Sequence, residues 1–121
     1  LTNLNLSGVV EFHLKNSAMA TMVVTNPHCP YGHIQVDNDC AVGFVEKPPC
    51  LHALCNTGIY IFNKQILEHL PDRGNIEETT FSVLAKKHQL KVYPFKGSFI
   101  TINTYKDLVT AEQELTRWKT K

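Results

Sequence analysis

The chain has 121 residues, of which 43% are hydrophobic and 19% charged, a composition that suits one folded domain over residues 1–121 and excludes a disordered chain. Its 12 basic and 11 acidic residues are mixed along the sequence and give a formal net charge of +1, so no nucleic-acid partner is expected. No apolar run reaches the roughly 18 residues that cross a bilayer, and residues 1–8 lack a signal-peptide pattern, so we expect a cytoplasmic protein with no membrane partner.

The first part of the chain predicts a helix and then a buried strand. Apolar residues recur at close to helical spacing in residues 4–16, where Asn3 or Asn5 can serve as the N-cap. Residues 18–25 (AMATMVVT) are apolar and β-branched, as in a strand that is covered on both faces.

The middle of the chain predicts a β-hairpin and a central strand. Residues 26–32 (NPHCPYG) are rich in turn formers and predict a loop. Residues 33–36 and 41–46 are strand-like and flank a polar turn at 37–39, and the prolines that follow end the second strand. Residues 57–62 (TGIYIF) have almost no polar interruption, so we expect this strand to be central and covered on both faces.

Two helices are expected next. Asn63 caps a short helix over residues 64–70, which Pro71 ends. Asn75 caps a second helix, in which Glu78 takes the capping-box position. The apolar face of this second helix is expected to consist of Phe81, Leu84, Ala85 and His88.

The C-terminal part predicts two short strands and a last helix. Residues 90–95 alternate and contain a proline, which indicates an edge strand or a strand end rather than a central strand. Residues 98–103 (SFITIN) predict another strand. Thr104 and Asp107 form a capping box at the start of the helix. Its apolar stripe, which must dock on the core or on a partner, consists of Leu108, Ala111, Leu115 and Trp118. The order of elements is that of a mixed α/β fold.

The cysteines raise the question of a zinc site, because three histidines lie near them. Their spacing contains no C-x2-C pair, the usual signature of structural zinc, and nothing indicates secretion. We therefore predict reduced thiols and no bound metal at Cys29, Cys40, Cys50 and Cys55.

Four short patterns, each weak alone, occur in one order along the chain. They are Tyr31-Gly32 followed by Asp37, FVEKP at 44–48, NTGIYIF at 56–62 and GSFITINTYKDL at 97–108. Together with IEETTFSVLA at 76–85 they resemble the sugar-1-phosphate nucleotidyltransferases, which join a sugar 1-phosphate to a nucleoside triphosphate and release pyrophosphate. The resemblance spans nearly the whole chain but only about the second half of a family catalytic domain. It implies an α/β fold with a partial Rossmann-like mixed sheet and flanking helices.

The FVEKP pattern offers two candidate ligand-binding side chains. Lys47, held extended by Pro48, can present its ammonium to a phosphate, and Glu46 can accept hydrogen bonds from sugar hydroxyls. An isolated Glu-Lys-Pro is more often a solvated pair at a hairpin end, and the surrounding pattern is what favours a binding role.

The resemblance adds four residues to this candidate site. A glycine at position 32 lets a ligand approach the backbone closely, although a plain turn glycine is the commoner meaning. The strand at 56–62 matches the one that lines the sugar pocket in the family, while Tyr60 could equally belong to the core. The predicted set that binds substrate is Gly32, Glu46, Lys47, Asn56, Thr57 and Tyr60.

The chain also departs from the family pattern. The G-x-G-x-R phosphate loop and the first metal-binding aspartate align upstream of Leu1, and Thr101 stands where the family has its second metal-binding aspartate. A neutral hydroxyl is a poor ligand for Mg²⁺. We therefore assign no catalytic or metal-binding residue and expect Mg²⁺ only together with a complementing nucleotide-binding half. The isolated chain is expected to be inactive.

Two hypotheses about function follow. In the first, the chain supplies the sugar-phosphate-binding half of a nucleotidyltransferase, either as a fragment of a longer gene or as one piece of a split enzyme with a complementing N-terminal half. In the second, it is a non-catalytic module that binds a sugar 1-phosphate or associates with itself. Half of a sheet leaves strand edges and apolar faces uncovered, so we expect either a homodimer or a complex with the missing half.

Overall fold

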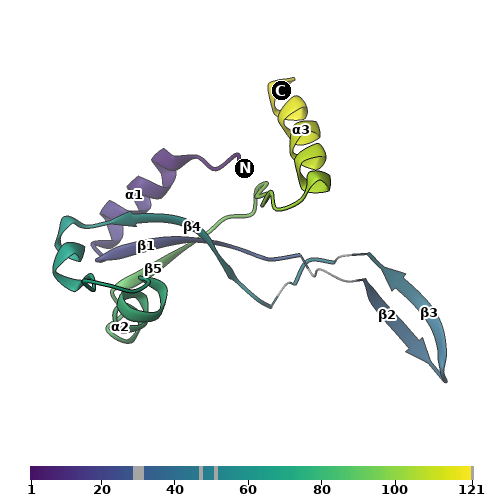
Figure 1. Cartoon of the computed structure of the whole chain (residues 1–121), viewed down its shortest axis with the longest axis horizontal. Helices are drawn as coiled ribbons and strands as arrows, with labels where there is room; N and C mark the ends of the chain where they lie inside the picture. Colours follow the sequence, from purple (N-terminus) through teal and green to yellow (C-terminus); the bar gives the residue numbers. More distant parts are fainter. Residues whose placement is uncertain (29–31, 47, 51, 121) are drawn as a thin grey trace.

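The computed structural model describes residues 1–28, 32–46, 48–50 and 52–120 (Figure 1). Its elements, in chain order, are α1 Leu6–Asn16, β1 Ala20–Thr25, β2 His33–Asp37, β3 Cys40–Val45, β4 Cys55–Phe62, the 3₁₀ helix η1 Lys64–His69, the π-helical turn η2 Glu77–Phe81, α2 Ser82–Lys86, β5 Leu90–Pro94 and α3 Tyr105–Lys119. No helix in these ranges is long and apolar enough to span a membrane.

The main sheet has three strands in the order β4-β1-β5. β1 is the central strand, antiparallel to β4 and parallel to β5, and four of its six residues are buried. This confirms the predicted buried strand, and the edge position predicted for residues 90–95 is also correct. The prediction that residues 57–62 form a central strand is wrong, because β4 lies at the other edge of the sheet and none of its residues is fully buried.

Helices cover both faces of this sheet. Successive side chains of a strand point to opposite faces, so Ala20 and Thr21 meet different layers. Thr21 faces α1, where its Oγ1 lies 2.9 Å from the Nδ1 of the buried His13. Ala20 forms the hydrophobic core with Ile66 of η1 and Leu84 of α2. Figure 1 shows α1 and α2 on opposite sides of β1 accordingly.

The predicted hairpin is confirmed and forms an arm that extends away from the main sheet (Figure 1). We call β2, β3 and their turn the hairpin arm. Asn38 and Asp39 both adopt positive φ values, 45° and 65°, as a two-residue hairpin turn requires. Every residue of β2 is exposed, and the apolar side chains of the arm that are 60–65% exposed are Ile34, Val36, Val42 and Phe44.

Side-chain caps begin the helices as predicted. Asn5, rather than Asn3, accepts a hydrogen bond from the backbone N–H of Ser7 at the start of α1. Asn63 caps η1, and Asn75 Oδ1 accepts from the N–H of Glu78 at 2.8 Å. At α3 the predicted capping box between Thr104 and Asp107 is complete.

Two expectations for the C-terminal half are wrong. Ala85 and His88 are exposed although Phe81 and Leu84 of the same predicted face are buried, and α2 ends at Lys86, so His88 lies beyond the helix with a φ of 56°. Residues 98–103 form no strand. They pair instead with the first residues of the chain, where Thr2 and Phe99 form a single bridge and the N–H of Ile100 donates to the carbonyl of Leu1 at 2.8 Å.

Candidate functional site

The structure places Gly32 and Glu46 together at the base of the hairpin arm. A side chain at position 32 would put its Cβ 2.5 Å from Cζ of the Phe44 ring and 3.1 Å from Oε2 of Glu46. Only glycine therefore fits here without displacing the ring. Lys47, predicted to bind phosphate beside Glu46, lies outside the described residues.

An open hollow of about 540 Å³ lies beside this pair. Its volume is in the range of small-molecule sites. Residues from both strands of the arm line it. The lining residues are Gly32, His33, Ile34, Gln35, Val45 and Pro48.

The other predicted residues lie on a bulge in β4. Between the pairs Met22–Tyr60 and Val24–Asn56, β4 contains more residues than β1, and Gly58 within the bulge has a φ of 77°. Asn56 holds this shape, because its Oδ1 accepts a hydrogen bond from the N–H of Gly58 at 2.8 Å. The left-handed glycine and the asparagine together turn the strand out of the regular ladder.

Thr57 fastens the bulge to the central strand. Its Oγ1 donates to the carbonyl of Val23 at 2.9 Å, and its side chain is half-buried. A hydroxyl has one hydrogen, so towards a ligand this oxygen can only accept. The sugar contact expected of Thr57 stays a prediction.

Tyr60 serves both the core and the surface. Its ring packs against Phe81, with centroids 4.9 Å apart, and against Phe62, with centroids 5.7 Å apart. Its hydroxyl lies at the exposed end, where it accepts a hydrogen bond from Nδ2 of Asn56 at 2.6 Å and faces Oε1 of Glu77 at 3.5 Å. The structure thus makes a polar row of Asn56, Tyr60 and Glu77, which we call the β4 polar row.

Glu77 is the member of this row that sequence reasoning missed. It lies in the first position of η2, next to Glu78. The sequence did contain a signal for Glu77, because this residue belongs to the IEETTFSVLA stretch that contributes to the family resemblance. What the sequence could not supply is the contact with Tyr60, which lies 17 residues earlier. The row offers carboxylate and amide groups of the kind that sugar hydroxyls require.

The described residues do not provide a set of ligands that fits Mg²⁺. Within them no group of three or more His, Cys, Asp or Glu side chains could hold a metal ion. Thr101 is exposed and offers only a neutral hydroxyl. Cys40, Cys50 and Cys55 are free thiols, and Cys29 lies outside the described residues.

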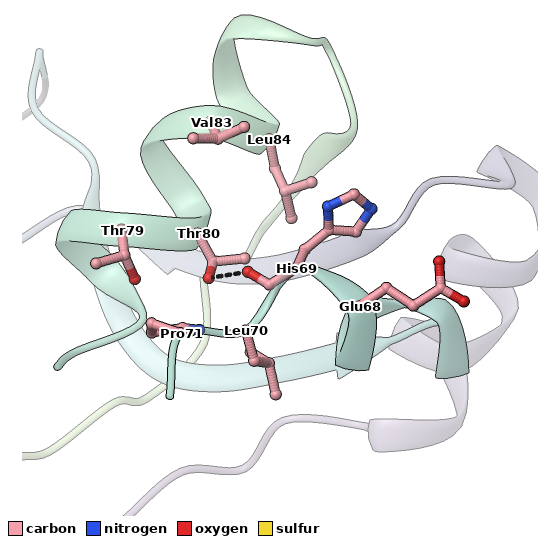
Figure 2. A pocket seen from close by; sticks show the side chains of 8 residues that line it. All are labelled: Glu68, His69, Leu70, Pro71, Thr79, Thr80, Val83 and Leu84. Atoms are coloured by element: carbon pink, nitrogen blue, oxygen red, sulfur yellow. Dashed lines mark hydrogen bonds between the residues drawn. The ribbon is translucent and has the colours of Figure 1, made fainter. Parts of the chain in front are cut away.

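A second hollow, of about 260 Å³, lies between the end of η1 and the turn from η2 to α2 (Figure 2). It contains none of the predicted site residues. The hydroxyl of Thr80 in its wall donates to the carbonyl of His69 at 2.8 Å, and that of Thr79 donates to the carbonyl of Asn75 at 2.6 Å. Both hydroxyl protons are thus used inside the fold, as is that of Thr57 in β4.

Comparison with known proteins gives one consistent result. A family model described as "Nucleotidyl transferase" matches residues 1–117. The "Probable glucose-1-phosphate cytidylyltransferase" of Bacillus subtilis (strain 168) is 30% identical over 111 residues, which cover 90% of this chain and 43% of that protein. The "Mannose-1-phosphate guanylyltransferase catalytic subunit beta" of Drosophila pseudoobscura pseudoobscura is 34% identical over 107 residues, covering 84% of this chain and 29% of the relative.

A solved structure matches the fold over nearly the whole chain. It is the crystal structure of a "Putative Glucose-1-Phosphate Thymidylyltransferase" from Bacillus anthracis in complex with a sucrose, with a TM-score of 0.62 and 16% identity. The match covers 93% of this chain and 50% of that one. The predicted α/β class, a partial Rossmann-like mixed sheet with flanking helices, is confirmed. The chain spans half or less of the proteins it matches.

Proposed function

Because the chain belongs to the nucleotidyl transferase family, we propose that it supplies the sugar-phosphate-binding half of a sugar-1-phosphate nucleotidyltransferase. The observation that carries this proposal is the β4 polar row, in which a bulge, a left-handed glycine and a packed aromatic ring hold Asn56, Tyr60 and Glu77 in one place. A bulge that re-aims side chains is a common device beside binding sites.

The polar groups of the row suit a sugar better than a nucleotide base. The carboxylate of Glu77 accepts hydrogen bonds from sugar hydroxyls, and the amide of Asn56 can also accept or donate. Glu46 adds a second carboxylate at the base of the arm, beside Gly32 and the Phe44 ring. In this proposal Lys47 meets the phosphate, and Thr57 and Tyr60 fix the geometry of the pocket wall.

The partner in this proposal is a nucleotide-binding half that adds to the outer edge of β4. The N–H of Asn63 donates to the carbonyl of Met19 at 2.9 Å, so this residue faces β1. Strand alternation then directs the backbone groups of Phe62 and Tyr60 outward. Unpaired edge groups accept a further strand readily. The N–H of Gly58 is already bonded to Asn56, which confines strand addition to the stretch beyond the bulge.

The alternative function is a non-catalytic module that binds a sugar 1-phosphate or associates with itself. The exposed, neutral Thr101 favours it, because a nucleotidyltransferase site needs charge neutralisation around the transferring phosphoryl group. The two functions share the same ligand site and differ only in whether a complementing half restores the chemistry.

Calorimetric titration with glucose 1-phosphate and mannose 1-phosphate tests the ligand site. We expect saturable binding of at least one sugar phosphate by the chain. Glu77→Gln should weaken it about tenfold, since a hydrogen bond to a charged group contributes about 1.5 kcal/mol. The matched control is Glu112→Gln on the exposed surface of α3, which should leave affinity unchanged. Equal binding by both variants would place the sugar site away from the β4 polar row.

An assay of pyrophosphate release tests whether the chain needs a complementing nucleotide-binding half for activity. With Mg²⁺, a panel of nucleoside triphosphates and the sugar phosphates, the chain alone should release no more pyrophosphate than its Lys47→Ala variant. Addition of the N-terminal half of a relative should produce release that depends on Lys47. Release by the chain alone above that variant would show that it carries a complete active site.

A further inference from the structure

Residues 98–103 carry a strand-like pattern, SFITIN, that the fold uses only in part. The first half of it, residues 98–100, pairs antiparallel with residues 1–3. Figure 1 shows the N-terminus beside the segment that leads into α3. Residues 101–103 form no β-bridge with any other described residue, although two of the three are β-branched and suit a strand. The second half of the pattern is therefore a strand-forming segment that has no partner strand.

The hydrogen bonds between Leu1 and Ile100 define how this pairing would continue. The ammonium of Leu1 donates to the carbonyl of Ile100 at 2.7 Å, and the N–H of Ile100 donates to the carbonyl of Leu1 at 2.8 Å. In an antiparallel ladder such hydrogen-bonded pairs recur at every second residue. The next pair would therefore join Ile102 to the second position before Leu1.

The backbone groups of Ile102 are available for that pair. No other described residue bonds to the N–H or the carbonyl of Ile102. The N–H of the next residue, Asn103, is instead taken up by α3, since it donates to Oδ2 of Asp107 at 3.1 Å. The side chain of Ile102 is 47% exposed. Unpaired strand-like backbone with an exposed apolar side chain readily accepts a further strand.

We propose that residues 101–103 are a second docking edge for the nucleotide-binding half, which supplies an extended segment that runs antiparallel to them towards Leu1. This inference rests on the proposed function and adds one attachment to the edge of β4. Main-chain hydrogen bonds provide the affinity in such strand addition, so the segment needs an N–H opposite Ile102 rather than a particular side chain. The chemistry is the same for a segment joined to Leu1 and for one on a separate chain.

Amide hydrogen exchange, followed by NMR, tests the segment when it is joined to Leu1. The chain is compared with a version extended before Leu1 by Val-Thr-Val-Thr. We expect the extension to slow exchange of the Ile102 N–H about tenfold, because that group gains a backbone acceptor. The N–H of Thr101 is the internal control and should exchange as before, since strand alternation directs it to the opposite side. Unchanged exchange at Ile102, or equal slowing at both residues, would overturn the proposal.

Binding of a separate half tests the segment in trans, with the N-terminal half of a relative as the probe. Ile102→Pro removes the N–H, whereas the matched control Ile102→Ala keeps it. We expect Ile102→Pro to bind the half about tenfold more weakly than Ile102→Ala, with the far-UV circular dichroism and the sugar-phosphate titration alike in both. Equal affinities would overturn the docking edge and leave the proposed function intact.

A half that does not bind the native chain would count against complementation in the proposed function. Slowed exchange of the Ile102 N–H in the extended chain would then show that the docked segment has to be joined to Leu1. The two experiments thus separate failure of the docking edge from failure of the proposed function.

Discussion

β1 and the hairpin arm are built from the same kinds of residues, yet β1 is mostly buried and the arm is mostly exposed. Val23 and Val24 of β1 are buried between neighbouring strands and helices, whereas Val36 and Val42 of the arm are largely exposed. β-branched residues fit a pleated strand in both places. The difference is that β1 has strands on both sides while the arm has only its own two. Composition therefore determines that a strand forms, and the neighbours determine how much stability it contributes.

The largest effect should come from the layer that packs on β1. Leu84→Ala removes a side chain that is 1% exposed and belongs to the core cluster with Ala20 and Ile66. We expect a loss of about 2–5 kcal/mol in the free energy of unfolding, measured by urea denaturation. Leu67→Ala, at an exposed leucine of η1, is the control and should change stability by no more than about 0.5 kcal/mol. Similar losses in both variants would show that the core lies elsewhere.

A smaller effect should come from the bulge in β4. Gly58 has a φ of 77° with no other atom within 4 Å of an added Cβ, so Gly58→Ala tests backbone conformation alone. We expect a loss of about 1–2 kcal/mol, the cost of a left-handed residue with a side chain. Gly8→Ala, within α1, should be neutral or stabilising because alanine favours a helix. A stable Gly58→Ala protein that still binds a sugar phosphate would show that the bulge is not needed.

The smallest effect should come from the arm itself. Phe44 is 64% exposed, so Phe44→Ala should change the free energy of unfolding by no more than about 0.5 kcal/mol. Urea denaturation of Phe44→Ala and Leu84→Ala under the same conditions compares their losses in the free energy of unfolding. A loss approaching that of Leu84→Ala would mean that the arm is packed in solution.

Local sequence signals predicted local structure well. The caps at Asn5, Asn63 and Thr104 and the hairpin turn each depend on residues within a few positions, and all are confirmed. Asn75 accepts the expected bond from the N–H of Glu78, although Ile76 takes the N-cap position of η2. The position of residues 57–62 in the sheet depends on which other strands are present, which their own apolar pattern does not encode. Residues 98–103 pair with the N-terminus, a contact that no short pattern signals.

The candidate site was predicted in part. The NTGIYIF pattern at 56–62 predicted Asn56, Thr57 and Tyr60 as site residues, and the structure brings Asn56 and Tyr60 into contact. Glu77 was not predicted as a site residue because its contact with Tyr60 forms only when η2 folds back over β4.

The parallel pairing of β1 with β5 has a consequence for synthesis of the chain. Ala20 pairs with Leu90, 70 residues later in the sequence (90 − 20). At about 5–20 residues per second, a ribosome needs roughly 4–14 s to make that interval. During this time the apolar strand β1 can pair only on its β4 side, once β4 has emerged. β1, the best protected strand of the main sheet once folding is complete, therefore waits longest for its second partner strand during synthesis.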